Sequence, residues 1–307
     1  MKPFRKHVAL AVDGGGIRGT MVAKALAVVE AELGRPCSEL FHLSAGTSTG
    51  SIISAAIAAR IPAERMHELY VRLGGTIFKK SWRTIWPLAI FKYPNEPLTA
   101  ALRDTLGELT FGDLPPFNVV IAIRDVKANR SLFVKTGKDE YTDMKLWYAV
   151  LCSSSVPTYF PVVDDRYVDG GVGAYTNPVY LAAWEAAYRL GWDQKETTLI
   201  SIGTGRAPAV PKSARPGRMN PLQWIRPLVD TFLSDSSDLQ VRLVRQFFPE
   251  LDFRRFQVDL EPSIEMDDPK GIPALTQWGE KLGRMILNDE LDAEAMQLPT
   301  WLTVPIP

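Results

Sequence analysis

Short apolar runs bounded by glycine or polar turns recur along the chain. Residues 8–12 (Val-Ala-Leu-Ala-Val) and 198–202 (Thr-Leu-Ile-Ser-Ile) are nearly uninterrupted, as expected for strands buried on both faces of a sheet. Residues 253–260 alternate instead, which predicts a half-exposed strand at the edge of the sheet. The predicted strands are 8–12, the run that ends before Gly46, 117–123, 131–135, 167–169, 198–202 and 253–260.

Segments with helical spacing of apolar residues lie between these strands. The predicted helices are 21–33, the stretch after Gly50, 62–73, 98–106, 146–152, 178–190, 221–248 and 273–290. Strands that alternate with helices predict an α/β fold, here a three-layer α/β/α sandwich around a mainly parallel sheet. We expect residues 1–307 to form a single domain, with a motif-bearing core at about 7–205 and a part without motifs at 206–307.

Composition and charge narrow the class of protein. Lys and Arg together number 35, as do Asp and Glu, so no overall field favours a nucleic acid. Cys37 and Cys152 form no metal-binding or disulfide motif, which suits the reducing cytoplasm. The apolar run at 8–12 is too short for a signal peptide, and a glycine turn interrupts the uncharged stretch 43–59. These features predict a soluble, cytoplasmic protein without a metal site.

A sharp turn at Gly46-Thr47-Ser48-Thr49-Gly50 joins a predicted strand to a predicted helix. A serine at the apex of such a turn takes strained backbone angles, and glycines two places away avoid the collisions that result. The following helix places free amides and a positive dipole end beside the hydroxyl. Ser48 is therefore the candidate nucleophile. The pattern alone also fits a glycine-flanked turn that carries a surface serine.

A glycine-rich turn, Asp13-Gly14-Gly15-Gly16-Ile17-Arg18-Gly19, follows the first predicted strand. Such a turn between a strand and a helix presents backbone N–H groups to an anion. Its spacing also fits a dinucleotide site, which would want an acidic residue at the end of the second strand. Here the second strand runs into the Ser48 turn instead, which disfavours a nucleotide.

A serine nucleophile needs a base, and the usual partner is a histidine that follows it late in the chain. The histidines are His7, His42 and His67. Only His67 follows Ser48, and it lies in a nearby predicted helix rather than in a late loop. We interpret all three as structural, so a base of another type is expected.

Asp169 is the best alternative base. It ends the strand predicted at 167–169, and the two glycines behind it permit a tight turn that aims the carboxylate. Asp164 and Asp165 lie nearby without such a turn. Aspartate is a weak base at its reference pKa of about 3.9, and desolvation together with a direct hydrogen bond to the serine compensates. On its own, an Asp-Gly turn that caps a strand is common in any protein.

Residues 74–98 interleave aromatic side chains with cations, glycine and proline. This composition suits a flap that contacts membranes peripherally, with Trp82 and Trp86 as candidate interface residues. The alternative is an ordinary loop whose aromatic side chains fold into the core.

Five motifs together resemble the patatin-like phospholipases. They are Asp13–Gly19, Gly46–Gly50, Pro157-Thr-Tyr-Phe-Pro161, Asp169-Gly-Gly171 and Ser201-Ile-Gly-Thr-Gly205, which occur in the order seen in that family and span about 8–205. The resemblance implies a dyad of Ser48 and Asp169, an oxyanion hole from Gly14, Gly15 and Gly16 with Arg18 close by, and no cofactor. Ser51 stands where the family often has a glycine, and Gly171 where it often has an alanine.

The sequence therefore predicts a lipid acyl hydrolase of the phospholipase A or carboxylesterase type, acting on phospholipid or other fatty-acyl esters through an acyl-enzyme on Ser48. One alternative is a phospholipase effector that degrades membranes only when a signal or partner opens it. A non-catalytic binding module is the other.

Overall fold

A sheet with strand order β4-β3-β2-β1-β6-β7 crosses the middle of the molecule, and β5 pairs separately with β3. The computed structural model describes residues 1–85, 90–206, 217 and 236–297. The strands are β1 (His7–Val12), β2 (Leu43–Gly46), β3 (Asn118–Asp125), β4 (Arg130–Lys135), β5 (Tyr167–Asp169), β6 (Thr197–Ile202) and β7 (Asp252–Phe256). Four pairings are parallel, and those of β3 with β4 and β5 are antiparallel.

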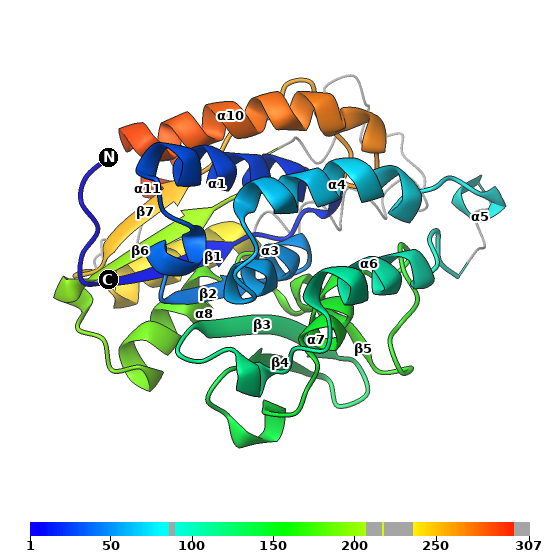
Figure 1. Ribbon diagram of the computed structural model, residues 1–307, viewed down its shortest axis with the longest axis horizontal. Helices are drawn as coiled ribbons and strands as arrows, with labels where there is room; N and C mark the ends of the chain where they lie inside the picture. Colours follow the sequence, from blue (N-terminus) through cyan, green and yellow to red (C-terminus); the bar gives the residue numbers. More distant parts are fainter. Residues whose placement is uncertain (86–89, 207–216, 218–235, 298–307) are drawn as a thin grey trace.

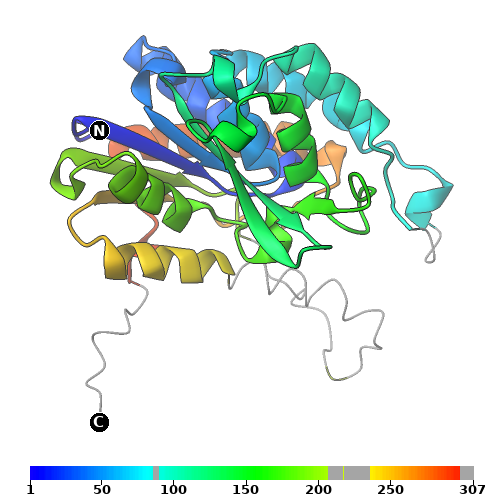
Figure 2. The ribbon, with the colours of Figure 1, turned by 90° about the horizontal axis from the view of Figure 1, so that it is seen from below.

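Helices cover both faces of this sheet (Figures 1 and 2). They are α1 (Gly19–Leu33), α2 (Cys37–Leu40), α3 (Thr49–Ala58), α4 (Ala63–Ile77), α5 (Trp82–Ile85), α6 (Glu96–Leu106), α7 (Leu146–Ser154), α8 (Val179–Trp184) with a π-helical turn at Glu185–Arg189, a helix at 236–247, α10 (Ile272–Asn288) and α11 (Ala293–Gln297). The α/β class predicted from the alternation of strands and helices is confirmed.

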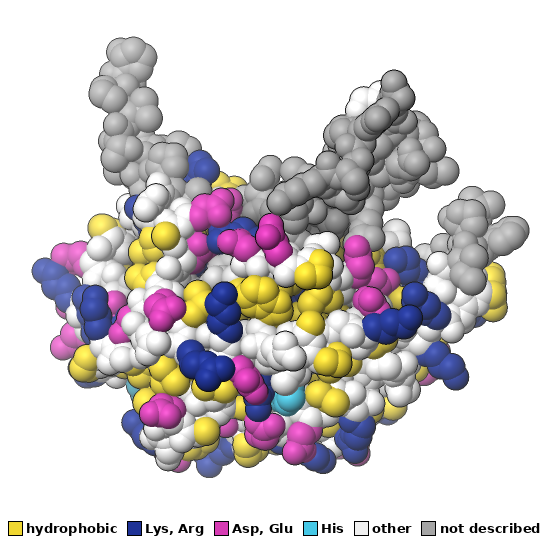
Figure 3. All heavy atoms as spheres, turned by 90° about the horizontal axis from the view of Figure 1, so that it is seen from above, with side chains coloured by type: hydrophobic (Ala, Val, Ile, Leu, Met, Phe, Trp, Pro, Cys, Tyr) yellow, Lys and Arg dark blue, Asp and Glu magenta, His cyan; other side chains and the backbone are white. Residues whose placement is uncertain are grey.

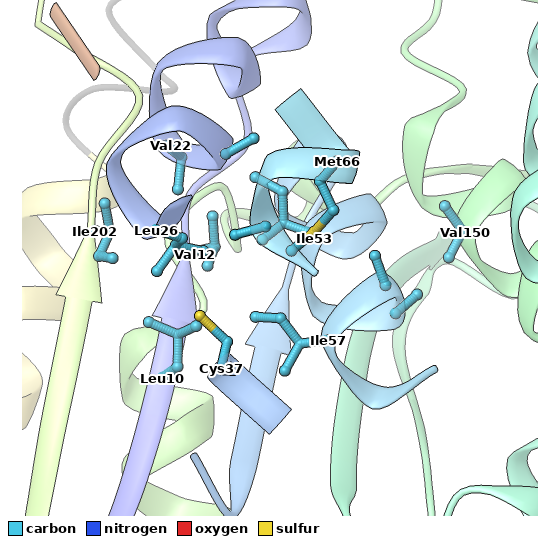
Figure 4. Packing of buried hydrophobic residues seen from close by; sticks show 14 of the residues in the cluster. Leu10, Val12, Val22, Leu26, Cys37, Ile53, Ile57, Met66, Val150 and Ile202 are labelled. Atoms are coloured by element: carbon cyan, nitrogen blue, oxygen red, sulfur yellow. The ribbon is translucent and has the colours of Figure 1, made fainter. Parts of the chain in front are cut away.

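The central strand β1 shows why the sequence forms three layers. Successive side chains of a strand point to opposite faces of the sheet. Leu10 and Val12 belong to the buried cluster that includes side chains of α1, α3 and α10, whereas Ala9 and Ala11 pack in a second cluster with side chains of α8 and 236–247. Figure 4 shows Leu10 and Val12 beside Leu26 and Ile53. β1 is therefore apolar at successive positions, because each face of the strand packs into a buried cluster of its own.

Two local expectations differ from the structure. The strand at the edge is β7, which is shorter than the predicted 253–260, and its last three residues are buried without alternation. Helix α4 continues through Ile77 rather than ending at Leu73.

The surface carries no dominant charge on the face shown in Figure 3, where acidic and basic side chains are interspersed with hydrophobic ones. Cys37 and Cys152 are both free and buried. In the part of the chain that the structure describes, no helix is both long enough and apolar enough to cross a membrane.

The glycines of the 46–50 turn allow α3 to start directly against the sheet. A Cβ atom on Gly50 would lie 2.1 Å from the carbonyl oxygen of Val12, and one on Gly46 would lie 2.2 Å from the carbonyl oxygen of Gly50. Both obstacles are backbone atoms, which cannot rotate away as a side chain would. The glycines therefore permit the contacts of the first turn of α3 with the ends of β1 and β2.

We predict that Gly50→Ala lowers the free energy of unfolding by about 3 kcal/mol, because the added methyl group displaces the backbone of β1 or α3. Gly75→Ala is the matched control: Gly75 is exposed in α4 and a Cβ there meets nothing within 4 Å. The control should gain about 0.5–1 kcal/mol from helix propensity. Urea denaturation measures both, and equal stabilities would contradict the close contact.

Candidate active site

Ser48 lies at the apex of the turn between β2 and α3, with φ 54° and ψ −128°. A residue with a side chain is strained in this left-handed region, and such strain persists only where the surroundings impose it. The Ser51 hydroxyl donates to the carbonyl oxygen of Ser48 at 2.6 Å, and the Thr47 hydroxyl donates to the carbonyl oxygen of Tyr175 at 2.6 Å. Ser51, the departure from the family pattern, thus fastens the first turn of α3.

Ser153 in α7 holds the backbone of Ser48. The amide of Ser48 donates to the Ser153 hydroxyl at 3.0 Å, and that hydroxyl donates to the carbonyl oxygen of Ala122 in β3 at 2.7 Å. The Ser153 side chain is fully buried, so both bonds are shielded from water. Sequence reasoning missed this role, because a serine 105 residues away in a turn-rich segment carries no local signal for such a contact.

Asp169 is brought to the same place by the end of β5. Its amide donates to the carbonyl oxygen of Ser155 at 3.1 Å, and its Oδ1 accepts from the amide of Gly171 at 2.7 Å. The end of α7 therefore contacts both Ser48 and Asp169. Among the described residues, none gives the buried Oδ2 a hydrogen bond of ordinary geometry.

Burial raises the pKa of Asp169 from its usual value near 3.8 to about 7, and the Gly171 amide and the Ser48 side chain oppose that rise. Only 3% of the residue is exposed, so the ionised form loses most of its hydration. A carboxylate with a pKa near neutrality accepts a proton far more readily than an exposed aspartate. The raised pKa makes Asp169 a stronger base than an aspartate at its reference pKa of about 3.9.

The glycine-rich turn lies beside Ser48, since a Cβ on Gly14 would be 3.1 Å from the Cβ of Ser48. The amide of Gly14 already donates to the carbonyl oxygen of Thr176 at 2.8 Å, so it is not available to an oxyanion. In the described part of the chain, no protein acceptor is assigned to the amides of Gly15 and Gly16. The predicted oxyanion hole therefore narrows to these two residues.

Neighbouring loops enforce the shape of this turn. A Cβ on Gly15 would meet the Thr204 hydroxyl at 2.3 Å, and one on Gly16, whose φ is 57°, would meet the carbonyl oxygen of Met266 at 2.3 Å. Arg18 donates from Nε to the carbonyl oxygen of Ile264 at 2.7 Å. Its guanidinium thus fastens the turn to a loop that sequence reasoning did not connect with it.

Asp13 opens the turn and forms a buried bidentate ion pair with Arg255 of β7, at 2.8 Å and 2.5 Å. Arg255 also donates to the Ser201 hydroxyl at 2.7 Å. Burial raises the pKa of Asp13, and the Arg255 guanidinium opposes that rise. The pair ties the ends of β1, β6 and β7 together below the glycine-rich turn.

The histidines have structural partners, as expected. The His7 ring stacks on Trp192 with ring centroids 4.7 Å apart, and the His42 Nδ1 accepts from the amide of Val8 at 3.0 Å. The His67 Nε2 is 3.0 Å from the Thr276 hydroxyl. None of the three lines the cavity that contains Ser48.

Residues 74–98 divide between core and surface. Phe78 and Tyr93 are buried against Phe160, which contradicts a wholly interfacial segment and agrees with the alternative of a loop that contributes to the core. Trp82 is 65% exposed, and the Arg83 guanidinium lies 5.3 Å from its ring centroid. Trp86 lies outside the described residues.

One cavity, with a volume of about 1330 Å³, is lined by several of the predicted site residues. They are Ser48, Asp169, Gly15, Gly16 and Arg18. It exceeds the volume of a typical small-molecule pocket, roughly 300–1000 Å³, and so has room for a large substrate.

Comparisons with known proteins identify related phospholipases. A protein-family model described as "Patatin-like phospholipase" matches residues 10–183 of this chain. The chain is 28% identical over 293 residues to an intracellular phospholipase A2 of Caenorhabditis elegans, covering 87% of this chain and 27% of that protein. It is 33% identical over 178 residues to a cGAMP-activated phospholipase of Pseudomonas aeruginosa, covering 54% of this chain and 52% of that one.

The chain thus spans about a quarter to a half of the length of these relatives. Among solved structures, VipD of Legionella pneumophila superposes with a TM-score of 0.51 at 12% identity, covering 93% of this chain and 67% of that one. This likeness concerns the fold alone.

We predict that Ser153→Ala slows the labelling of Ser48 by a serine-directed fluorophosphonate by on the order of tenfold, because the Ser48 amide loses its acceptor and the strained turn relaxes. Ser155→Ala is the matched control. Its hydroxyl is also fully buried, but it donates only to the carbonyl oxygen of Leu151 in its own helix, at 2.8 Å. Equal labelling rates for two variants of similar melting temperature would show that Ser153 does not position Ser48.

Proposed function

Because the chain belongs to the patatin-like phospholipase family, we propose that it is a lipid acyl hydrolase that cleaves carboxylic esters through Ser48 and Asp169. The observation that carries the proposal is the buried carboxylate of Asp169, with a pKa raised to about 7, in the same cavity as a serine on a strained turn. The proposed dyad needs no histidine, which agrees with the structural partners of all three.

The proposed reaction uses two half-reactions at one serine. The Ser48 Oγ attacks the carbonyl carbon of the ester while Asp169 takes the hydroxyl proton. The carbonyl oxygen becomes an oxyanion that accepts hydrogen bonds from the amides of Gly15 and Gly16. The tetrahedral intermediate then expels the alcohol, which receives the proton from Asp169, and the acyl group remains on Ser48.

Water completes the cycle. Asp169, ionised again, takes a proton from a water molecule that attacks the acyl-enzyme, and returns that proton to Ser48 as the fatty acid leaves. The carboxylate therefore acts once as base and once as acid in each half-reaction. A pKa near neutrality suits both roles, since neither protonation state is strongly disfavoured.

Membrane lipid is the proposed source of the ester. Trp82 in α5 is exposed with Arg83 beside it, a pairing that settles at the boundary between headgroups and acyl chains. The proposal of peripheral contact rests on this exposed end of residues 74–98, and not on Phe78 or Tyr93, which are buried.

We predict that Ser48→Ala and Asp169→Asn each lower the hydrolysis of a soluble dye ester by on the order of a thousandfold or more, because the two groups act as a unit. The measurement is steady-state turnover, together with the melting temperature of each variant. His67→Gln serves as the control, since a histidine outside the cavity should change turnover by less than about tenfold.

Four outcomes separate the alternatives. Retention of a tenth or more of the turnover by Asp169→Asn would exclude it as the base. A collapse with His67→Gln at an unchanged melting temperature would favour a serine-histidine mechanism. Turnover by the wild-type chain only after a signal molecule is added would favour the regulated effector, and no turnover under any condition would favour a binding module.

A further inference from the structure

Residues 264–267, which we call the 264–267 loop, lie against the glycine-rich turn. The carbonyl oxygen of Met266 accepts a hydrogen bond from the amide of Ile17 at 2.9 Å, and a Cβ on Gly16 would meet the same oxygen at 2.3 Å. Arg18 donates from Nε to a second carbonyl oxygen of this loop at 2.7 Å. The backbone of the 264–267 loop therefore limits where the glycine-rich turn can lie.

The side chain of Asp267 fastens this loop to a different part of the molecule. Its Oδ2 accepts from the hydroxyl of Tyr93 at 3.0 Å and lies 3.1 Å from the Nζ of Lys92. Tyr93 is buried and the Asp267 side chain is largely so, and hydrogen bonds to a carboxylate in such surroundings are strong. Asp267 does not line the cavity itself, so its influence on a reaction there has to pass through the loop.

The motif at 157–161, which has no role in the proposed reaction, holds both partners of Asp267. The amide of Lys92 donates to the carbonyl oxygen of Thr158 at 2.9 Å. The amide of Tyr93 donates to the carbonyl oxygen of Tyr159 at 2.8 Å, and the Tyr159 ring centroid lies 4.2 Å from the Lys92 Nζ. The motif thus fixes the backbone from which the ammonium and hydroxyl groups reach the carboxylate.

The position of the glycine-rich turn matters because of its proposed oxyanion donors. The amides of Gly15 and Gly16 directly precede that of Ile17, which the 264–267 loop holds. Such donors contribute most when they are fixed in place before the charge develops. A displacement of about 1 Å at a reacting centre can lower a rate by about a hundredfold. A shift of the loop would therefore reach the proposed oxyanion hole.

We propose that Asp267 is a positioning residue: by fixing the 264–267 loop, it holds the amides of Gly15 and Gly16 where the oxyanion forms. The inference rests on the proposed ester hydrolysis for its kinetic part. The hold of the loop on the glycine-rich turn is a separate property, which can be measured without a substrate.

The kinetic test compares a soluble dye ester with its thionoester. Asp267→Ala should lower kcat for the dye ester by on the order of tenfold with KM within about threefold, because the oxyanion is absent from the bound substrate. Sulfur is a weak hydrogen-bond acceptor, so the thionoester gains less from the oxyanion hole and should lose less. The ratio of the two kcat/KM values, oxygen ester to thionoester, should therefore fall.

Two further variants accompany Asp267→Ala. Asp267→Asn keeps the shape of the side chain and an oxygen for the Tyr93 hydroxyl, so it is expected to fold and to show a smaller fall in the ratio. Asp268→Ala is the matched control, because Asp268 is also half-buried outside the cavity but accepts from the amide of Lys270, at 3.1 Å. An unchanged ratio in both Asp267 variants, or an equal fall with Asp268→Ala, would overturn the proposal while leaving ester hydrolysis intact.

Hydrogen exchange at the amide of Ile17 separates the hold of the loop from the chemistry. This amide should exchange on the order of tenfold faster in Asp267→Ala and at the wild-type rate in Asp268→Ala. If no ester is hydrolysed but exchange accelerates in this way, the proposed function fails and the positioning of the turn by Asp267 stands. If exchange at Ile17 is the same in Asp267→Ala as in wild type, the positioning role fails whatever the enzyme hydrolyses.

Discussion

The backbone of Ser48 is the constraint on which the site depends. Its φ of 54° is one that a residue with a side chain rarely adopts, and the surrounding structure has to hold it there. Gly46 and Gly50 supply the clearance, because a Cβ at either would collide with backbone oxygen atoms. Ser153 supplies the acceptor for the Ser48 amide, and through Ala122 it links the turn to β3. The close packing of α3 against the sheet and the exposure of the hydroxyl to the cavity both follow from this turn.

The two buried carboxylates near the Ser48 turn, Asp13 and Asp169, differ in whether a cation compensates their charge. Asp13 faces Arg255 in a bidentate pair, so its negative charge is compensated and it serves as an anchor for the glycine-rich turn. Asp169 has no cation opposite it among its described partners; only the Gly171 amide and the Ser48 side chain lower its pKa. Its pKa is therefore raised to about 7, as the proposed role as base requires. An uncompensated buried carboxylate costs stability, as functional groups in active sites often do.

The features predictable from the sequence are those with local causes. The buried strands at 8–12 and 198–202 show as apolar runs because both of their faces are covered, and the turn at Ser48 shows as paired glycines because its backbone angles require them. Such requirements act within a few residues. They can therefore be recognised in a single sequence without knowledge of the fold.

The features that escaped prediction depend on contacts between distant segments. Ser153 lies 105 residues from Ser48, and Arg255 lies 242 residues from Asp13. The Gly14 amide is removed from the predicted oxyanion hole by the carbonyl oxygen of Thr176, and Tyr93 is drawn into the core by Phe78 and Phe160. A serine, an arginine or an aromatic residue has many common roles, so its type alone does not identify such a partner.

The pH dependence of fluorophosphonate labelling at Ser48 tests the central claim most directly, because it reports the base without requiring the natural substrate. The base must be ionised to accept the serine proton, so the labelling rate should be low in acid and rise with pH to half its maximum near the Asp169 pKa of about 7. In Asp169→Asn the rate should be lower by orders of magnitude and the transition near pH 7 should vanish. A variant that labels as fast as wild type, with the same transition, would show that another group activates Ser48.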